Sequence, residues 1–195
     1  MISGKGSIMK AIVAACDSGQ LNANVTTVIS SQPRAGFQLT KGWCDMRGIA
    51  CYHNRKDFYE HDFQWESVLG SLIALSNPDL VCLAGYMSVL PEGIVSQYEG
   101  RMINIHPSLL PKYKGLVTHR RALENGDSTH GATVHYVIPE LDSGPIISQK
   151  SVFIYELDNE IILRDRVRSI EHELYVSSIK TILEEGVDKH YKSMI

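Results

Sequence analysis

The chain has 195 residues, of which 44% are hydrophobic and 21% are charged, and it carries a formal net charge of −3. This length suits a single α/β domain over residues 1–195, with enough apolar residues for one proper core. The slightly acidic balance argues against a general nucleic-acid binder, which needs a basic face, and no apolar run approaches the roughly 20 residues of a membrane span.

Helical and strand patterns alternate along the first half of the chain. The run Leu-Val-Cys-Leu-Ala-Gly at 80–85 is continuously apolar, as expected for a strand buried on both faces of a parallel sheet. Only Met1 and Ile2 precede the turn Ser-Gly-Lys-Gly-Ser, although a doubly wound sheet normally opens with about five apolar residues. We therefore expect either a start upstream or a stunted first strand. The patterns predict helices over 7–16, 35–47 and 63–75, and strands over 25–29, 49–52 and 80–85.

The second half contains further strands, a strand pair and a long helix. In that helix Leu163, Val167, Ile170 and Leu174 are spaced 4, 3 and 4 apart, which places them on one apolar face. The predicted fold class is α/β, with a doubly wound, mostly parallel, Rossmann-like sheet flanked by helices and an antiparallel strand pair toward the C-terminal half. The patterns predict a short helix near 91, helices over 118–125 and 158–185, and strands over 101–105, 131–138 and 145–154.

The cysteines indicate a cellular compartment rather than a site. Cys16, Cys44, Cys51 and Cys82 form no Cys-x-x-Cys pair, which argues against a zinc or redox motif. Cys82 lies in an apolar run and is interpreted as a small core residue. This usage indicates a reducing compartment, and no signal peptide is visible, so we expect a cytoplasmic protein.

Two polar side chains stand where a buried strand should end, in the segment Ile-Asn-Ile-His-Pro at 103–107. Side chains two apart in a strand point to the same face, so Asn104 and His106 should converge at the strand's carboxyl end, where open α/β sheets bind ligands. Pro107 and Pro111 should stiffen the following loop. A capping asparagine and a packed histidine would explain the pair equally well.

Asp142 lies in the segment Glu-Leu-Asp-Ser-Gly at 140–144, which is first of all a hairpin turn. It becomes functional only if the fold brings it to His106. A carboxylate beside a histidine favours the charged imidazole and fixes its tautomer.

The segment Ser-Gly-Lys-Gly-Ser at 3–7 matches neither a P-loop nor a dinucleotide fingerprint, because the lysine lies between the glycines and position 9 is Met. What remains is a glycine turn opening a helix, whose free N–H groups can hold a phosphate. An ordinary strand–helix turn is the alternative. Arg168 and Glu171 share one face of the last helix, and an exposed ion pair is the usual explanation for such a pair.

The candidates include no covalent nucleophile and no metal site. The Gly-x-Ser-x-Gly elbow is absent, and nothing aims Ser108 at the imidazole of His106. The remaining histidines have no ligand spacing, and His130 and His135, five apart in a strand-like segment, should face opposite sides. An Asn, His and Asp trio suits direct transfer between two bound substrates, with oxyanion stabilisation by the first two and proton movement by the third.

The sequence resembles the folate-dependent formyltransferases, and among them the glycinamide ribonucleotide formyltransferases of purine synthesis. The most specific motifs are Asn-x-His-Pro-Ser-Leu-Leu-Pro and Leu-Asp-x-Gly-Pro, and the resemblance runs from Ile2 to about Gly186. It rests on the stretches 2–7, 83–87, 104–115, 121–127, 130–149 and 171–175.

The resemblance implies an enzyme that moves the formyl group of 10-formyltetrahydrofolate to 5′-phosphoribosylglycinamide, with no metal. It implies small-molecule partners, neither nucleic acid nor membrane, and is compatible with a monomer or a homodimer. The implied residues fall into three sets. Catalytic roles fall on Asn104, His106 and Asp142; ribonucleotide binding falls on Gly4, Lys5, Gly6, Ser7, Arg168 and Glu171; folate binding falls on Met87, Ser88, Val89, Leu90, Val137, Glu140 and Leu141.

Some positions depart from the family pattern. Lys5 and Ile8 stand where the family often has Asn, and Ser88 replaces a common arginine beside the folate pocket. We expect these changes to alter affinity rather than reaction type. The resemblance also suggests a cis peptide bond at Leu110-Pro111, since tight loops beside active sites are where cis-proline occurs.

Two related enzymes share this chemistry. Methionyl-tRNA formyltransferase carries a further C-terminal domain, and formyltetrahydrofolate deformylase, a hydrolase, carries an N-terminal regulatory domain. From the chain length we expect neither domain. A non-catalytic folate or nucleotide binder is a third alternative. It would not require the intact trio of Asn104, His106 and Asp142.

Overall fold

The computed structural model describes all residues, 1–195. The predicted elements are present in the predicted order, and two short helices were not predicted: the 3-10 helix η1 (Lys56–Phe58) and α7 (Val187–Lys192). The other helices are α1 (Ser7–Asp17), α2 (Arg34–Asp45), α3 (Asp62–Leu75), α4 (Glu92–Gln97), α5 (Thr118–Glu124) and α6 (Glu160–Glu185). The strands are β1 (Thr27–Ser30), β2 (Ala50–His53), β3 (Val81–Leu83), β4 (Met102–His106), β5 (Thr129–Tyr136) and β6 (Ile146–Phe153).

The strands form two sheets, one of β1 and β2 and one of β3, β4, β5 and β6, with the predicted combination of parallel and antiparallel pairs. β1 pairs with β2 and β3 with β4 in parallel, whereas β4, β5 and β6 are antiparallel neighbours. The short N-terminal segment joins the two halves, because the Ile2 N–H donates to the carbonyl oxygen of Ile29 (3.0 Å) and the Ala84 N–H donates to that of Met1 (2.9 Å). Ile2 itself forms an isolated parallel bridge with Ser30 rather than a strand.

Helices cover both faces of the sheet, in agreement with the predicted layers. One apolar cluster joins α1 and α6 to the strands, and the other joins α3 and α4 to the opposite face. On α6 the predicted apolar face is confirmed, since Leu163, Val167 and Leu174 are buried and Ile170 packs against the same cluster.

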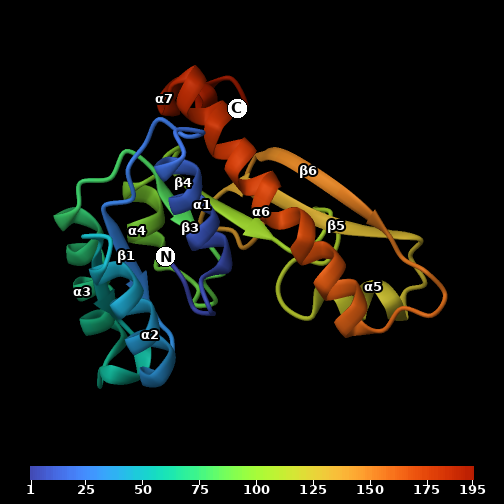
Figure 1. The fold of residues 1–195 in the computed structure, drawn as a ribbon, viewed down its shortest axis with the longest axis horizontal. Helices are drawn as coiled ribbons and strands as arrows, with labels where there is room; N and C mark the ends of the chain where they lie inside the picture. Colours follow the sequence, from blue (N-terminus) through green and yellow to red (C-terminus); the bar gives the residue numbers. More distant parts are fainter.

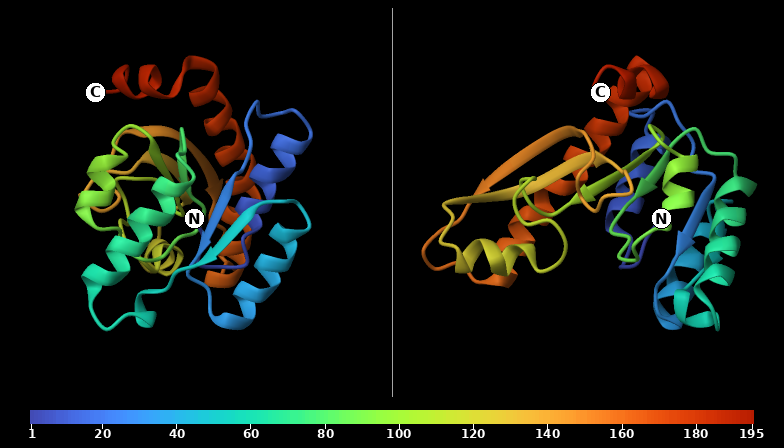
Figure 2. Two further views of the ribbon diagram at one scale, coloured as in Figure 1. Left: turned by 90° about the vertical axis from the view of Figure 1, so that its left-hand side faces the viewer. Right: turned by 180° about the vertical axis from the view of Figure 1, so that it is seen from behind.

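The β5–β6 hairpin projects away from the N-terminal half, and α6 runs along it toward α1 (Figure 1). The reverse view in Figure 2 shows the same elongated arrangement, with α5 near the far end of the hairpin. β4 is the last parallel strand and the first antiparallel neighbour. Its carboxyl end therefore lies where the parallel half of the sheet meets the projecting hairpin.

Candidate active site

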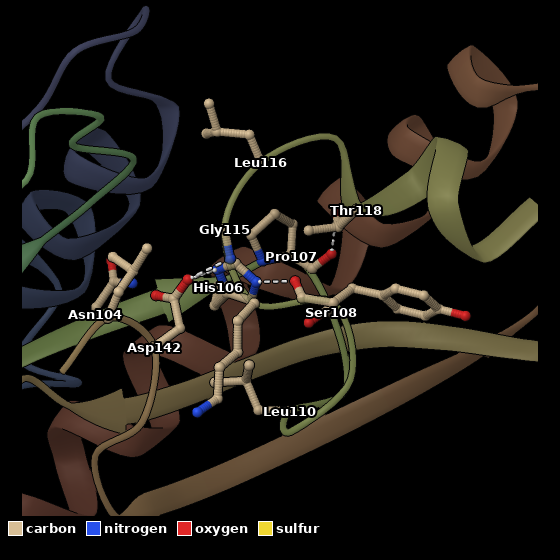
Figure 3. A network of polar contacts seen from close by, with 12 residues as sticks. Asn104, His106, Pro107, Ser108, Leu110, Gly115, Leu116, Thr118 and Asp142 are labelled. Atoms are coloured by element: carbon tan, nitrogen blue, oxygen red, sulfur yellow. Dashed lines mark hydrogen bonds and ion pairs between the residues drawn. The ribbon is translucent and has the colours of Figure 1, made fainter.

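Asn104, His106 and Asp142 come together at the carboxyl end of β4, as the sequence predicts. The His106 and Asp142 side chains are 7% and 8% exposed, and His106 Nδ1 lies 3.4 Å from Asp142 Oδ2 (Figure 3). Asn104 and His106 are two apart in one strand and share a face. The structure therefore meets the condition under which Asp142 could be functional, its approach to His106.

Asp142 occupies an unusual backbone conformation in the connection between β5 and β6. Its φ of 48° is in the left-handed region, which non-glycine residues seldom adopt. The Gly115 N–H donates to its Oδ2 (2.8 Å), which holds the carboxylate beside His106. A strained backbone at a buried, hydrogen-bonded carboxylate is typical of a functional position.

The tripeptide 113–115 contacts both His106 and the Asp142 turn. His106 Nε2 donates to the Tyr113 carbonyl oxygen (2.9 Å), and Gly115 contacts Asp142 as above. Between them, Lys114 Nζ reaches Ser143 Oγ (2.5 Å). Since both ring nitrogens of His106 face oxygen acceptors, only the imidazolium carries a proton for each of them.

His135 is a member of the site that the sequence analysis missed. It lies directly opposite Asn104 in the antiparallel ladder, and its Nε2 is 3.2 Å from Asn104 Nδ2 and 3.7 Å from Asp142 Oδ1. Its Nδ1 donates to the Tyr136 carbonyl oxygen (2.8 Å), so Nε2 of the neutral ring accepts from the Asn104 amide. Burial lowers the pKa of His135, which favours this neutral form.

His135 therefore orients the Asn104 amide. One hydrogen of Asn104 Nδ2 is used by His135, and the second is left for a ligand. The alternation of side chains along β5 indicates which residues share a face with His135, but only the register of β5 against β4 identifies Asn104 as its partner.

The loop after His106 is held by hydrogen bonds more than by its prolines. Thr133, opposite His106 in the ladder, donates to the Ser108 carbonyl oxygen (2.6 Å) and accepts from the Leu110 N–H (3.0 Å). Gln149 Nε2 donates to the Leu110 carbonyl oxygen (2.8 Å). The predicted cis bond at Leu110-Pro111 is confirmed. Ser108 Oγ donates to the Lys112 carbonyl oxygen and not to His106, in agreement with the sequence analysis.

The Gly4–Ser7 turn opens α1 without a side-chain cap. Gly6 is the N-cap residue, with φ of 69°, and no side chain caps the first N–H groups of the helix, which is the arrangement that can bind an anion. Gly4 and Lys5 are exposed. Ile8 is 8% exposed and belongs to the core, so this departure from the family pattern contributes packing instead of a polar group.

Arg168 and Glu171 lie on α6, which packs along α1. Arg168 is exposed and Glu171 is half-buried, and the two form no ion pair within 4 Å. Burial raises the pKa of the Glu171 carboxyl, and the positive charge of Arg168 opposes this shift. The expected surface ion pair is thus not formed, and neither side chain has an ion-pair partner within 4 Å.

The predicted folate residues lie on two loops, one after β3 and one after β5. Met87 and Val89 are 65% and 71% exposed on the first loop, and Leu141 is 52% exposed on the second, next to Asp142. Leu90 and Val137 pack against the same apolar cluster, which brings the two loops onto one side of the sheet. Exposed apolar side chains beside a buried polar trio are typical of a ligand site.

A second pair of histidines lies outside the trio. His130 Nε2 and His119 Nδ1 are 3.2 Å apart, and burial, with the nearby His119, lowers the pKa of His130 to about 4. No group of three His, Cys, Asp or Glu side chains is arranged to hold a metal ion. No helix is long and apolar enough to cross a membrane.

Comparisons with known proteins identify relatives over nearly the whole chain. Residues 1–179 match the family model described as formyl transferase. The chain is 42% identical to the phosphoribosylglycinamide formyltransferase of Escherichia coli strain K12, over 97% of this chain and 88% of the relative.

Solved structures show the same fold. Glycinamide ribonucleotide transformylase 1 from Symbiobacterium toebii superposes with a TM-score of 0.86 at 35% identity, covering 94% of this chain and 85% of that one. A formyltetrahydrofolate deformylase from Pseudomonas syringae pv. tomato also gives 0.86, at 29% identity, but the match covers 60% of its length against 95% of this chain. The fold alone does not separate these two activities.

We expect Gly144→Ala to disrupt the Asp142 turn. A Cβ at Gly144 would overlap the carbonyl oxygen of Tyr136, a backbone atom of β5 that cannot move aside. Overpacking of this kind destabilises by about 1–3 kcal/mol, measured by urea unfolding. Gly42→Ala is the matched control, because a Cβ there, on helix α2, meets no atom within 4 Å. Equal stability of the two variants would contradict the expected overlap between the new Cβ and the Tyr136 carbonyl oxygen.

Proposed function

The chain belongs to the formyl transferase family, and we propose that it transfers the formyl group of 10-formyltetrahydrofolate to the amine of 5′-phosphoribosylglycinamide. The products are formylglycinamide ribonucleotide and tetrahydrofolate, a step of purine biosynthesis. The observation that carries this proposal is the buried Asp142 carboxylate held 3.4 Å from His106 at the strand end that bears Asn104.

The trio supplies what acyl transfer needs without a covalent enzyme intermediate. The substrate amine attacks the formyl carbon, a tetrahedral intermediate forms, and the former carbonyl oxygen becomes negative. The free hydrogen of Asn104 Nδ2 is a donor for that oxygen, and the His106 imidazolium, whose two N–H groups face Tyr113 and Asp142, stabilises it by its positive charge. Preorganised donors of this kind are worth about 10²–10³ in turnover each.

Asp142 is the group that accepts the proton from the attacking nitrogen. The attacking amine must lose a proton, and the folate N10 must gain one as the carbon–nitrogen bond breaks. Asp142, directly or through a water, accepts the first proton, and its charge stabilises the imidazolium of His106. The separation of 3.4 Å leaves room for this contact to tighten when substrates bind.

The two substrates approach from different sides of the trio. The ribonucleotide phosphate binds the uncapped N-terminus of α1 at Gly4–Ser7, with Lys5 and Arg168 adding positive charge. Glu171 binds the ribose or glycinamide end of the same substrate. The folate lies against the exposed apolar side chains of the loops 87–90 and 137–142.

A hydrolase is the second candidate, because a formyltetrahydrofolate deformylase shares the fold. The same trio could direct water to the formyl carbon instead of the ribonucleotide amine. The uncapped α1 turn and the unpaired Arg168 favour the transferase, since a hydrolase has no need of a phosphate site.

A turnover assay separates these functions. We expect the protein to consume 10-formyltetrahydrofolate only when glycinamide ribonucleotide is present, with one formylated ribonucleotide formed per tetrahydrofolate. Absorbance of the folate and mass spectrometry of the ribonucleotide measure the two products. Consumption without the ribonucleotide would instead identify a hydrolase, and no consumption at all a binding protein.

Asp142→Asn should lower turnover by about 10²-fold or more, the scale of general acid–base catalysis. The change keeps the shape of the side chain but removes its charge, so ribonucleotide binding, measured by calorimetry, should change little. The matched control is Asp45→Asn, since Asp45 forms only an exposed ion pair with Lys41 on α2. Near-normal turnover of the Asp142 variant would reduce Asp142 to a turn residue.

Arg168→Ala should raise the KM for the ribonucleotide by about 10-fold or more, because a charge-assisted hydrogen bond contributes about 1.5–3 kcal/mol. The folate KM should stay the same. Arg164→Ala is the control, as this exposed arginine on the same helix pairs only with Asp165. An unchanged ribonucleotide KM would remove Arg168 from the phosphate site.

A further inference from the structure

Asp127 is a buried carboxylate that the catalytic trio does not include. It follows α5, where its own N–H donates to the Ala122 carbonyl oxygen (3.2 Å), and its side chain is only 10% exposed. It lies two residues before β5. A carboxylate buried to this extent needs hydrogen-bond donors around it, so its partners show which part of the molecule it holds.

Two of the donors around Asp127 come from the loop that follows β4. Tyr113 O–H donates to Oδ2 (2.8 Å), and Lys112 Nζ donates to the same oxygen (3.1 Å). On the other side, Asn125 Nδ2 donates to Oδ1 (2.8 Å). Burial raises the pKa of the Asp127 carboxyl, but these hydrogen bonds outweigh burial, so the pKa lies below its usual value. Asp127 is therefore a charged acceptor, which makes its hydrogen bonds stronger than neutral ones.

Lys112 and Tyr113 differ as partners of this carboxylate. The Lys112 side chain is 61% exposed, and exposed lysine pairs contribute little because water competes for both groups. The Tyr113 ring is half-buried, with the Arg121 guanidinium 5.2 Å from its centroid and the His130 ring 6.0 Å away. Neighbouring side chains thus hold the Tyr113 ring, and Asp127 holds its hydroxyl.

The backbone of Tyr113 contacts the catalytic histidine. Its carbonyl oxygen accepts from His106 Nε2 (2.9 Å), and its φ of 59° lies in the left-handed region that non-glycine residues seldom adopt. Such a conformation persists only where surrounding contacts hold it. One contact is the hydrogen bond from Arg121 Nη1 to the Lys114 carbonyl oxygen (2.7 Å), and the other is the bond between Tyr113 and Asp127. The direction of the Tyr113 carbonyl therefore depends on side chains from α5 and the turn after it.

We propose that Asp127 is a positioning residue for His106: through the Tyr113 hydroxyl it holds the Tyr113 backbone, whose carbonyl oxygen fixes the Nε2 side of the imidazole. Asp142 lies on the Nδ1 side of the same ring. The ring is thus held between two carboxylates, one beside it and one that acts through a tyrosine. This role rests on the proposed formyl transfer, in which the charge of His106 stabilises the developing oxyanion.

The test breaks the bond between Tyr113 and Asp127 from each end. Tyr113→Phe removes only the donor, and Asp127→Ala removes only the acceptor. Misplacement of a catalytic group by about 1 Å can cost about 10²-fold in rate, so we expect each change to lower kcat about 10-fold or more. The KM of both substrates should stay the same. The double variant should lose no more than the weaker single variant, because both changes break one link.

A conservative variant separates the hydrogen bond from the charge of Asp127. In Asp127→Asn the amide oxygen can still accept from the Tyr113 hydroxyl, while the exposed Asn125 amide can turn to face the new NH₂ group. We therefore expect Asp127→Asn to keep most of the kcat that Asp127→Ala loses. An equal loss in both variants would mean that the charge acts on the site directly, which contradicts the link through Tyr113.

Tyr191 and Glu99 supply matched controls, because they form the same kind of contact outside the site. The Tyr191 hydroxyl donates to Glu99 Oε1 (3.0 Å), on an exposed part of the surface. Tyr191→Phe and Glu99→Ala should leave kcat and both KM values unchanged. A fall in kcat equal to that of the Tyr113 and Asp127 variants would mean that any lost tyrosine–carboxylate pair slows the enzyme.

The imidazole itself is followed by NMR on protein with isotope-labelled histidine, where His106→Gln identifies the His106 signals by their loss. We expect the Nε2 proton of His106 to exchange with water at least ~10-fold faster in Tyr113→Phe and Asp127→Ala than in the unaltered protein. Tyr191→Phe should not change it. This measurement needs no turnover, so it can fail or succeed independently of the proposed formyl transfer.

Three results would overturn the positioning role: an unchanged kcat in both single variants, a raised KM with an unchanged kcat, or unchanged exchange of the His106 proton. The second result would place Asp127 in substrate binding instead. If Asp127→Ala does not fold, Tyr113→Phe decides by both measurements, because it leaves the carboxylate with Lys112 and Asn125 as partners.

Discussion

The site depends on how one carboxylate is held. Asp142 lies in a turn that its own local sequence explains, but its φ of 48° and its buried side chain are stabilised from outside the turn. The Gly115 N–H supplies a direct hydrogen bond to the carboxylate, and Lys114 reaches the turn at Ser143. The buried bond is the more important of the two, because exposed lysine contacts contribute only about 0–1 kcal/mol. The segment 113–115 thus couples the end of β4 to the β5–β6 turn.

The elements and the pairing of Asn104 with His106 on one strand face could be predicted because their signals are local. Strand alternation places Asn104 and His106 on one face, and apolar spacing identifies the face of α6 that packs on the sheet. The expectation that Asp142 lies beside His106 came from the family resemblance, because a Leu-Asp-Ser-Gly turn does not by itself predict a functional carboxylate. Short elements such as η1 and α7 carry too few residues for a periodic signal.

What could not be predicted is the register between strands. His135 is adjacent to Asn104 only because β5 pairs with β4 in one of several possible alignments, and a shift by one residue would turn it to the other face. The tautomer of His135 depends in turn on its bond to the Tyr136 carbonyl. The conformation of the loop 107–111 could not be predicted either, because Thr133 and Gln149 hold it from two other strands. These contacts have no counterpart in local sequence.

The catalytic trio and the proposed phosphate site are supported by different parts of the structure. The trio is built where the parallel strand β4 meets the antiparallel hairpin, and neighbouring strands hold it on several sides. The Gly4–Ser7 turn follows residues 1–3 instead, which bond to Ile29, Ser31 and the 82–85 segment. The proposed phosphate site needs its N–H groups held in fixed directions, so its affinity should depend on how firmly residues 1–3 are held. Because the trio has separate supports, loosening residues 1–3 should weaken ribonucleotide binding while the arrangement around His106 is preserved.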